Sequence, residues 1–230
     1  MERLTKVLRA WEGMRTSDLL RLLQDIAGED AERRGAGRPA LVERGCVWVL
    51  VRNRLDIRRF PVPGESFRVT TWPMKGRLGL YPRLFELSAA DGELLLRVES
   101  LWAVMDIGSR AMFPCEERGV VMEGVEDGRL APQRRLTVSE GGEVFAFTPA
   151  PEQIDENGHM NNAAYLDAAE ALLPETLRGK RPCAVAVDYE HEILPGRETQ
   201  LRVVPGENAC LFEGSMEGKV CFRLREDFPV

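Results

Sequence analysis

The stretch QIDENGHMNNAAYLDAAEALLP, residues 153–174, decides the fold, because it leads a crowded polar loop directly into a run with helical character. The strand-like run GEVFAFTP precedes it. Four further strand-like runs follow it, namely CAVAVDYEHEIL (183–194), RETQLRVVP (197–205), NACLFEGSM (208–216) and KVCFRLRED (219–227). The second half of the chain therefore predicts one strand, a helix over residues 160–174 and then four strands.

The first half of the chain shows the same order of elements without repeating the sequence. Apolar residues recur at helical spacing over residues 19–31, after Thr16 or Ser17 as N-cap and before a stop at Gly35. Strand-like runs then occupy residues 41–60, 65–73, 80–92 and 92–107. Each half thus predicts one helix and an antiparallel meander.

A helix followed by a meander buries its apolar face best when the sheet curls around it. Residues 114–135 lose the alternation and gain charge, glycine and proline, as a linker does. We therefore predict an α+β fold with an N-terminal domain, residues 1–125, and a C-terminal domain, residues 126–230. Joining the two sheets edge to edge into one large curved sheet would remove exposed strand edges.

Composition and charge limit the classes of function. The chain is 44% hydrophobic and 30% charged, as ordinary globular proteins are. Its charged N-terminus lacks a signal-peptide core, and no run reaches the roughly 18 apolar residues of a membrane span, so we expect a cytoplasmic protein without a membrane partner. The net charge of −6 argues against a nucleic-acid partner. The basic segments AERRGAGR and RGKRP are either solvated surface or a local patch for an acidic partner.

The cysteines indicate neither disulfides nor a metal. Their number is odd, they are scattered, and none forms a C-x-x-C pair. We expect buried free thiols and no metal or cofactor. The five positions are Cys46, Cys115, Cys183, Cys210 and Cys221.

Asp155, Asn157 and His159 stand two residues apart just before the predicted helix, so one side of a turn could carry all three. One reading is structural: an Asn-Gly turn with Asp155 or Asn157 as helix cap. The other is a polar site, which Asn161 and Asn162 favour, because asparagine is a poor choice for a first helical turn. In that case free N–H groups at the helix start would stabilise a developing oxyanion, and a carboxylate or histidine would activate water. Spacing alone does not say which electrophile is attacked.

A second polar group lies on the run CAVAVDYEHEIL, which carries Asp188, Glu190, His191 and Glu192. Acids on an otherwise apolar strand are costly unless they are exposed or functional. Either reading fits the pattern, and His191 by itself is typical of a surface residue.

Together these segments resemble the acyl-acyl carrier protein thioesterases of plants and bacteria. The resemblance rests on D-x-N-x-H-x-N-N-x-x-Y, from Asp155 to Tyr165, on VDYEHE ending at Glu192, and on the first-half runs VWVLVRNRLDIRRFP, TTWP and SLWAVMDIGSRA. It implies a double-hotdog fold, with acyl-chain binding in the N-terminal half and catalysis in the C-terminal half. It also implies release of free fatty acid from acyl carrier protein, in fatty acid biosynthesis.

The resemblance implies Asp155, Asn157, His159 and Glu192 as catalytic residues. Glu192 would activate water, His159 would assist proton transfer, Asn157 would orient the carbonyl or the water, and Asp155 would bond to the helix start. A route with a carboxylate nucleophile and an anhydride stays open. The family often has a cysteine after the glutamate, but Ile193 stands here, so a cysteine nucleophile at that position is impossible.

One geometric conflict remains in this assignment. On a regular strand Glu192 shares a face with Asp188 and Glu190, opposite the apolar face that would pack on the helix. Only a bulge before Pro195 would turn Glu192 to the site; otherwise His191 would face it.

Two other functions remain open: a hotdog acyl-CoA thioesterase and a non-catalytic acyl-binding protein. The complete set of titratable motif residues weighs against a pure binder. The chain could be a monomer or a homodimer. Large apolar residues that could line an acyl tunnel, or simply pack in the core, are Trp48, Leu50, Phe60, Trp72, Phe85 and Trp102.

Overall fold

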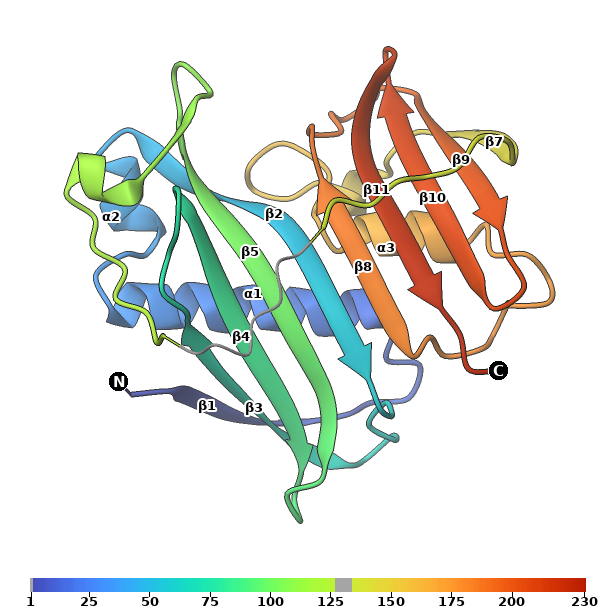
Figure 1. Ribbon diagram of the computed structural model, residues 1–230, viewed down its shortest axis with the longest axis horizontal. Coiled ribbons are helices and arrows are strands. Elements are labelled where there is room, and N and C mark those ends of the chain that lie inside the picture. Colours follow the sequence, from blue (N-terminus) through green and yellow to red (C-terminus); the bar gives the residue numbers. More distant parts are fainter. Residues whose placement is uncertain (1, 127–133) are drawn as a thin grey trace. The chain divides into compact units, whose positions relative to one another are not determined.

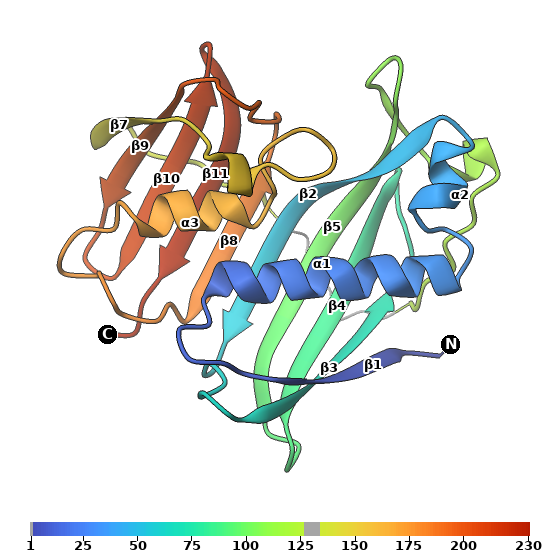
Figure 2. The same ribbon diagram turned by 180° about the vertical axis from the view of Figure 1, so that it is seen from behind.

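The computed structural model describes residues 2–126 and 134–230, and the chain divides into two compact units. The first unit comprises Met1–Arg15 and Leu19–Gln133; the second comprises Thr16–Asp18 and Arg134–Val230. In each unit one helix lies across a face of an antiparallel sheet (Figures 1 and 2). The predicted order of one helix and four following strands in each half is therefore confirmed. The sheets are not simple meanders, because Cys46–Ile57 pairs with Leu94–Asp106 and Ala184–Tyr189 pairs with Lys219–Asp227.

The first unit holds one long helix, two short helices and six strands within its described residues. Its sheet runs in the order β1-β3-β4-β5-β2, and β6 pairs with β5. The elements are β1 Leu4–Arg9, α1 Thr16–Arg33, α2 Arg38–Val42, β2 Cys46–Ile57, β3 Ser66–Pro73, β4 Leu80–Ala89, β5 Leu94–Asp106, β6 Met112–Phe113 and the 3-10 helix η1 Cys115–Arg118. The sequence did not predict β1, in which only Leu4 is buried and the other residues are half-buried or exposed.

The core of the first unit forms where α1 covers the sheet. Leu19, Leu20 and Leu23 of α1 are at most 2% exposed, and they face the inner side of the strands, where Phe67 and Phe85 are equally buried. Each such side chain contributes about 1.5–3 kcal/mol by leaving water.

None of the helices in residues 2–126 and 134–230 is long and apolar enough to cross a membrane.

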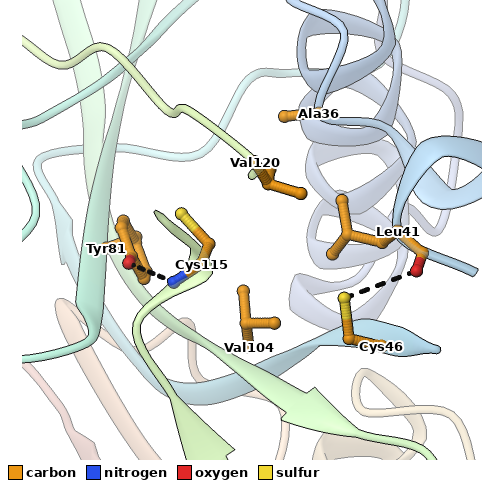
Figure 3. Packing of buried hydrophobic residues seen from close by; sticks show 7 residues of the cluster. All are labelled: Ala36, Leu41, Cys46, Tyr81, Val104, Cys115 and Val120. Atoms are coloured by element: carbon orange, nitrogen blue, oxygen red, sulfur yellow. Dashed lines mark hydrogen bonds between the residues drawn. The ribbon is translucent and has the colours of Figure 1, made fainter. Parts of the chain in front are cut away.

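A smaller apolar cluster lies under α2 and η1 (Figure 3). Cys46 and Cys115 are buried there, and Tyr81 Oη accepts a hydrogen bond from the Cys115 N–H at 2.7 Å. Cys210 and Cys221 are also buried, and Cys183 is partly so, as free thiols. The expectation of free cysteines is confirmed. The predicted linker, 114–135, contains η1, and its residues 127–133 lie outside the described part of the chain.

A buried ion pair crosses the core of the first unit. Arg83 Nη1 on β4 donates to Asp30 Oδ2 on α1 at 2.7 Å, and the two side chains are 6% and 2% exposed. Arg34 also donates to Asp30, at 2.9 Å. Burial raises the pKa of a carboxyl group, but hydrogen bonds and charge from Arg34 and Arg83 outweigh it and lower the pKa of Asp30. Asp30 is therefore ionised and neutralises Arg83.

We expect Asp30→Ala to lower the free energy of unfolding by about 3–5 kcal/mol, because it leaves the Arg83 charge buried without its partner. Glu29→Ala is the matched control on the same helix. Its pair with Lys6 is exposed, 38% and 45%, so about 0–1 kcal/mol is expected. Urea unfolding of both variants measures this; equal losses would show that the buried pair contributes no more than a surface pair.

The second unit has the sheet order β8-β11-β10-β9-β7. Its elements are β7 Glu143–Phe147, the 3-10 helix η2 Pro151–Gln153, α3 Ala164–Glu170, β8 Ala184–Tyr189, β9 Thr199–Pro205, β10 Ala209–Met216 and β11 Lys219–Asp227. The predicted helix over 160–174 is shorter at both ends. Asn161 draws the Ala163 N–H to its own side-chain oxygen at 2.9 Å, an alternative to helical bonding. At the other end Pro174 disfavours helical backbone in the residue before it.

Candidate active site

The motif residues form a tight turn in the second unit. The Gly158 N–H donates to the Asp155 carbonyl oxygen at 3.0 Å, and Gly158 has φ 80°, which glycine adopts without strain. Asp155 Oδ1 accepts the Asn157 N–H at 2.8 Å, and the Asp155 N–H donates to the His159 carbonyl oxygen at 3.0 Å. The turn prediction is confirmed. The helix-cap prediction is wrong, because the N-cap is Ala163 and no side chain caps α3.

His159 lies between two carboxylates. Its Nδ1 is 4.0 Å from Asp155 Oδ1, and its Nε2 is 3.8 Å from Glu192 Oε1. Both gaps exceed a direct hydrogen bond, and at such separations a bridging water must be considered. The side chains are 20% exposed for His159 and Asp155 and 32% for Glu192, so solvent and substrate can reach them. In the tautomer protonated at Nδ1, the ring donates to the Met160 carbonyl oxygen at 3.3 Å and leaves Nε2 toward Glu192.

Glu192 reaches His159 because the strand pattern breaks before it. Strand β8 ends at Tyr189, and the next two N–H groups, of Glu190 and His191, both donate to the Cys221 carbonyl oxygen, at 2.8 and 3.1 Å. Two residues opposite one partner shift the later side chains to the other face, as a bulge does. The bulge before Pro195 that Glu192 needs in order to face the site is therefore present, and His191 is exposed.

The other acids of this segment are structural. Asp188 Oδ2 accepts the Leu136 N–H at 2.6 Å and is 2% exposed. Glu190 pairs with Arg135 and Arg223. Arg223 Nε also forms an ion pair with Glu213 Oε2 at 2.8 Å, on the neighbouring strand. The presence of Asp188 and Glu190 on this segment is explained by their bonds to a backbone N–H and to arginines, rather than by solvent exposure or catalysis.

Two of the N–H groups at the start of α3, which the sequence suggested as donors to an oxyanion, already have partners. The Ala163 N–H is taken by the Asn161 side chain, and the Ala164 N–H donates to the Asn161 carbonyl oxygen at 2.8 Å. Asp155 also does not bond to this helix start; its hydrogen bond stays within the turn, at Asn157. Asn157 is exposed in that turn, which the hydrogen bond from the Asp155 N–H to the His159 carbonyl oxygen closes.

A small hollow with little free space lies in the first unit between α1 and the sheet. Of the predicted tunnel residues, Leu50, Phe85 and Trp102 line it, whereas Trp72 packs in a separate cluster with Met74. Polar side chains that were not predicted from the sequence also line the hollow, namely Gln24, Asn53 and Ser100. In the sequence, each of them stands out as a polar residue at an inward-facing position of an otherwise apolar face.

Comparison with known proteins agrees with this arrangement. Residues 10–118 match the N-terminal domain of acyl-ACP thioesterases, and residues 139–219 match their C-terminal domain. The chain belongs to the acyl-ACP thioesterase family. The members of this family that it resembles include an acyl-[acyl-carrier-protein] hydrolase of Cuphea viscosissima, 28% identical over 171 residues, and a palmitoyl-acyl carrier protein thioesterase of Cuphea hookeriana, 27% identical over 180. The matches cover 69% and 73% of this chain but 41% and 43% of these chloroplastic relatives.

Solved structures of the family show the same fold. An acyl-ACP thioesterase of Bacteroides thetaiotaomicron superposes with a TM-score of 0.87 at 24% identity, over 99% of this chain and 98% of the other. The 12:0-ACP thioesterase of Umbellularia californica superposes with a TM-score of 0.83 at 19% identity, over 99% and 97%. The predicted double hotdog is confirmed.

Proposed function

We propose that this protein hydrolyses the thioester of fatty acyl-acyl carrier protein and releases the free fatty acid. The observation that carries the proposal is the placement of His159 between Asp155 and Glu192, at partly exposed positions, within residues 139–219 that match the family's C-terminal domain. Family membership supports the choice of thioester as the electrophile. Because this chain spans less than half of the plant relatives' length, the substrate is a proposal that rests on these two supports.

In the proposed reaction, a water held between Glu192 and His159 attacks the thioester carbonyl carbon, and Glu192 takes one water proton. The tetrahedral intermediate then collapses and its C–S bond breaks. The proton passes through His159 to the leaving sulfur, so thioester and water become carboxylic acid and thiol. Asn157 orients the carbonyl or the water, and Asp155 holds the turn and faces His159 Nδ1.

The N-terminal half binds the acyl chain in this proposal, and the hollow between α1 and the sheet is its candidate site. The partner is an acyl carrier protein, which arrives with the acyl group; neither nucleic acid nor a membrane takes part. Cytoplasmic location and a monomeric or homodimeric state stay predictions. Cell fractionation and light scattering would measure them.

The test is a chain-length series of acyl carrier protein thioesters beside the matching acyl-CoAs, at equal concentrations. We expect hydrolysis with a higher kcat/KM for the carrier-protein substrates, because they present a second surface for recognition. Equal kcat/KM for both series would instead identify an acyl-CoA thioesterase. If no thioester is hydrolysed while lipid co-purifies with the protein, it is an acyl-binding protein and the proposal fails.

A further inference from the structure

The segments that carry His159 and Glu192 are joined through their neighbours' backbones. The Met160 N–H donates to the Ile193 carbonyl oxygen at 2.9 Å. Both residues are fully buried, so this hydrogen bond is shielded from water. This hydrogen bond sets the distance between the two segments directly beside His159 and Glu192.

The other backbone group of Ile193 is held by a side chain of α3. The Ile193 N–H donates to Tyr165 Oη at 3.3 Å. This N–H belongs to the peptide unit that begins at the Glu192 carbonyl carbon, so its direction fixes the Glu192 backbone. Since β8 ends at Tyr189, no regular strand ladder does this in its place.

Tyr165 is a rigid anchor. Its ring is 2% exposed and meets Phe222 at 4.7 Å and Tyr189 at 5.6 Å between centroids, both edge to face. Phe222 cannot recede, because its ring lies against Gly214, where an added Cβ would come within 2.0 Å. Burial is the main cause of a raised pKa of Tyr165, and the charge of Glu192 adds to it, so the hydroxyl stays protonated.

We propose that Tyr165 is a positioning residue for the hydrolysis: its hydroxyl group holds the Ile193 amide and thereby keeps the Glu192 carboxylate at His159. The proposal rests on the function proposed above. Tyr165 acts through Glu192 and does not touch the reacting atoms. If the tyrosine served only to fill the core, phenylalanine would replace it without effect on the catalytic pair.

The variant Tyr165→Phe removes the hydroxyl and keeps the ring. We expect kcat to fall about 10- to 100-fold with KM unchanged, since a misplacement of 1 Å can cost about 100-fold in rate. In a Glu192→Gln background the same substitution should change kcat less than about twofold, because effects through a shared residue are not additive.

Tyr81→Phe is the matched control. Tyr81 is a buried tyrosine of the first unit whose hydroxyl also accepts a backbone N–H, from Cys115 at 2.7 Å. Both variants leave a buried N–H without a partner. Tyr81→Phe also removes the hydrogen bond from Tyr81 Oη to Glu116 Oε2 at 2.7 Å, so its loss of stability is expected to be at least as large. Only Tyr165→Phe should lower kcat. Equal losses of kcat, or a full tenfold loss that persists in the Glu192→Gln background, would overturn the proposal.

A second readout does not depend on activity. The chain has two histidines, so ¹H–¹³C spectra contain two ring Cε1–H signals, one from His159 and one from His191. We expect Tyr165→Phe to move the His159 signal toward its position in Glu192→Gln and to leave the His191 signal in place. An unmoved His159 signal overturns the positioning role. If the wild-type protein hydrolyses no thioester but the signal moves as stated, the proposed function fails and the positioning role stands.

Discussion

Glu192→Gln is expected to lower kcat for thioester hydrolysis about 10²- to 10⁴-fold, the usual range for removal of a general acid or base. The amide keeps the size and the placement of the side chain 3.8 Å from His159 Nε2 but cannot accept the water proton. The free energy of unfolding should change by less than about 0.5 kcal/mol, since Glu192 is 32% exposed. Steady-state kinetics and urea unfolding on the same preparations measure both quantities.

His159→Ala should lose activity to a similar extent, and the neighbouring His191→Ala is the control. His191 is one residue from Glu192 and is exposed, so its loss should leave kcat within about twofold, as for surface substitutions away from a site. If His191→Ala were as damaging as Glu192→Gln, the alternative in which His191 faces the substrate would be correct and the role of Glu192 would be lost.

Glu226 on β11 gives the second large expected effect, on stability. Its carboxylate is fully buried, and neither oxygen has a hydrogen-bond partner among the described residues. Glu170 of α3 and Cys210, opposite it on β10, are the titratable groups that face it. Burial, with a smaller contribution from the charge of Glu170, raises the pKa of Glu226 to about 8 from an ordinary value of 4.5.

The sign of the pH dependence follows from these two pKa values. Between pH 4.5 and 8 the unfolded chain has released the Glu226 proton and the folded protein retains it, so stability falls as pH rises. This group alone contributes a slope of up to about 1.4 kcal/mol per pH unit in that window. Below pH 4.5 the contribution vanishes, and above pH 8 it stays constant at its full cost.

Glu226→Gln should remove that slope, because the amide does not ionise. We expect the variant to gain several kcal/mol relative to the wild-type protein between pH 4.5 and 8, at up to about 1.4 kcal/mol per unit. Urea unfolding at intervals of half a pH unit measures the difference. Glu198→Gln, at an exposed position, serves as control, and its stability should depend on pH as that of the wild-type protein does. Parallel curves for Glu226→Gln as well would mean that Glu226 gains a solvating partner in solution.

The sequence by itself determined the order of elements and the position of the motif. Hydrophobic alternation placed β2 to β5 and β8 to β11 inside the expected runs, because most inward-facing positions on a strand are apolar where a helix covers them. The Asn-Gly turn was also readable, since Gly158 needs the left-handed backbone that glycine permits. These are local properties, which residues close together in the sequence specify.

Only the tertiary structure decided which acid faces His159. Alternation along CAVAVDYEHEIL places Glu192 with Asp188 and Glu190, and two N–H groups that share the Cys221 carbonyl oxygen reverse that placement. The partners that satisfy Asp188 and Glu190 come from Leu136, Arg135 and Arg223, 33 to 55 residues away. Tyr165 likewise acquires its contact with the Ile193 N–H across 28 residues. Contacts between segments so distant along the chain leave no periodic trace in the sequence, so the geometry of the site emerges only when the sheet and α3 are packed together.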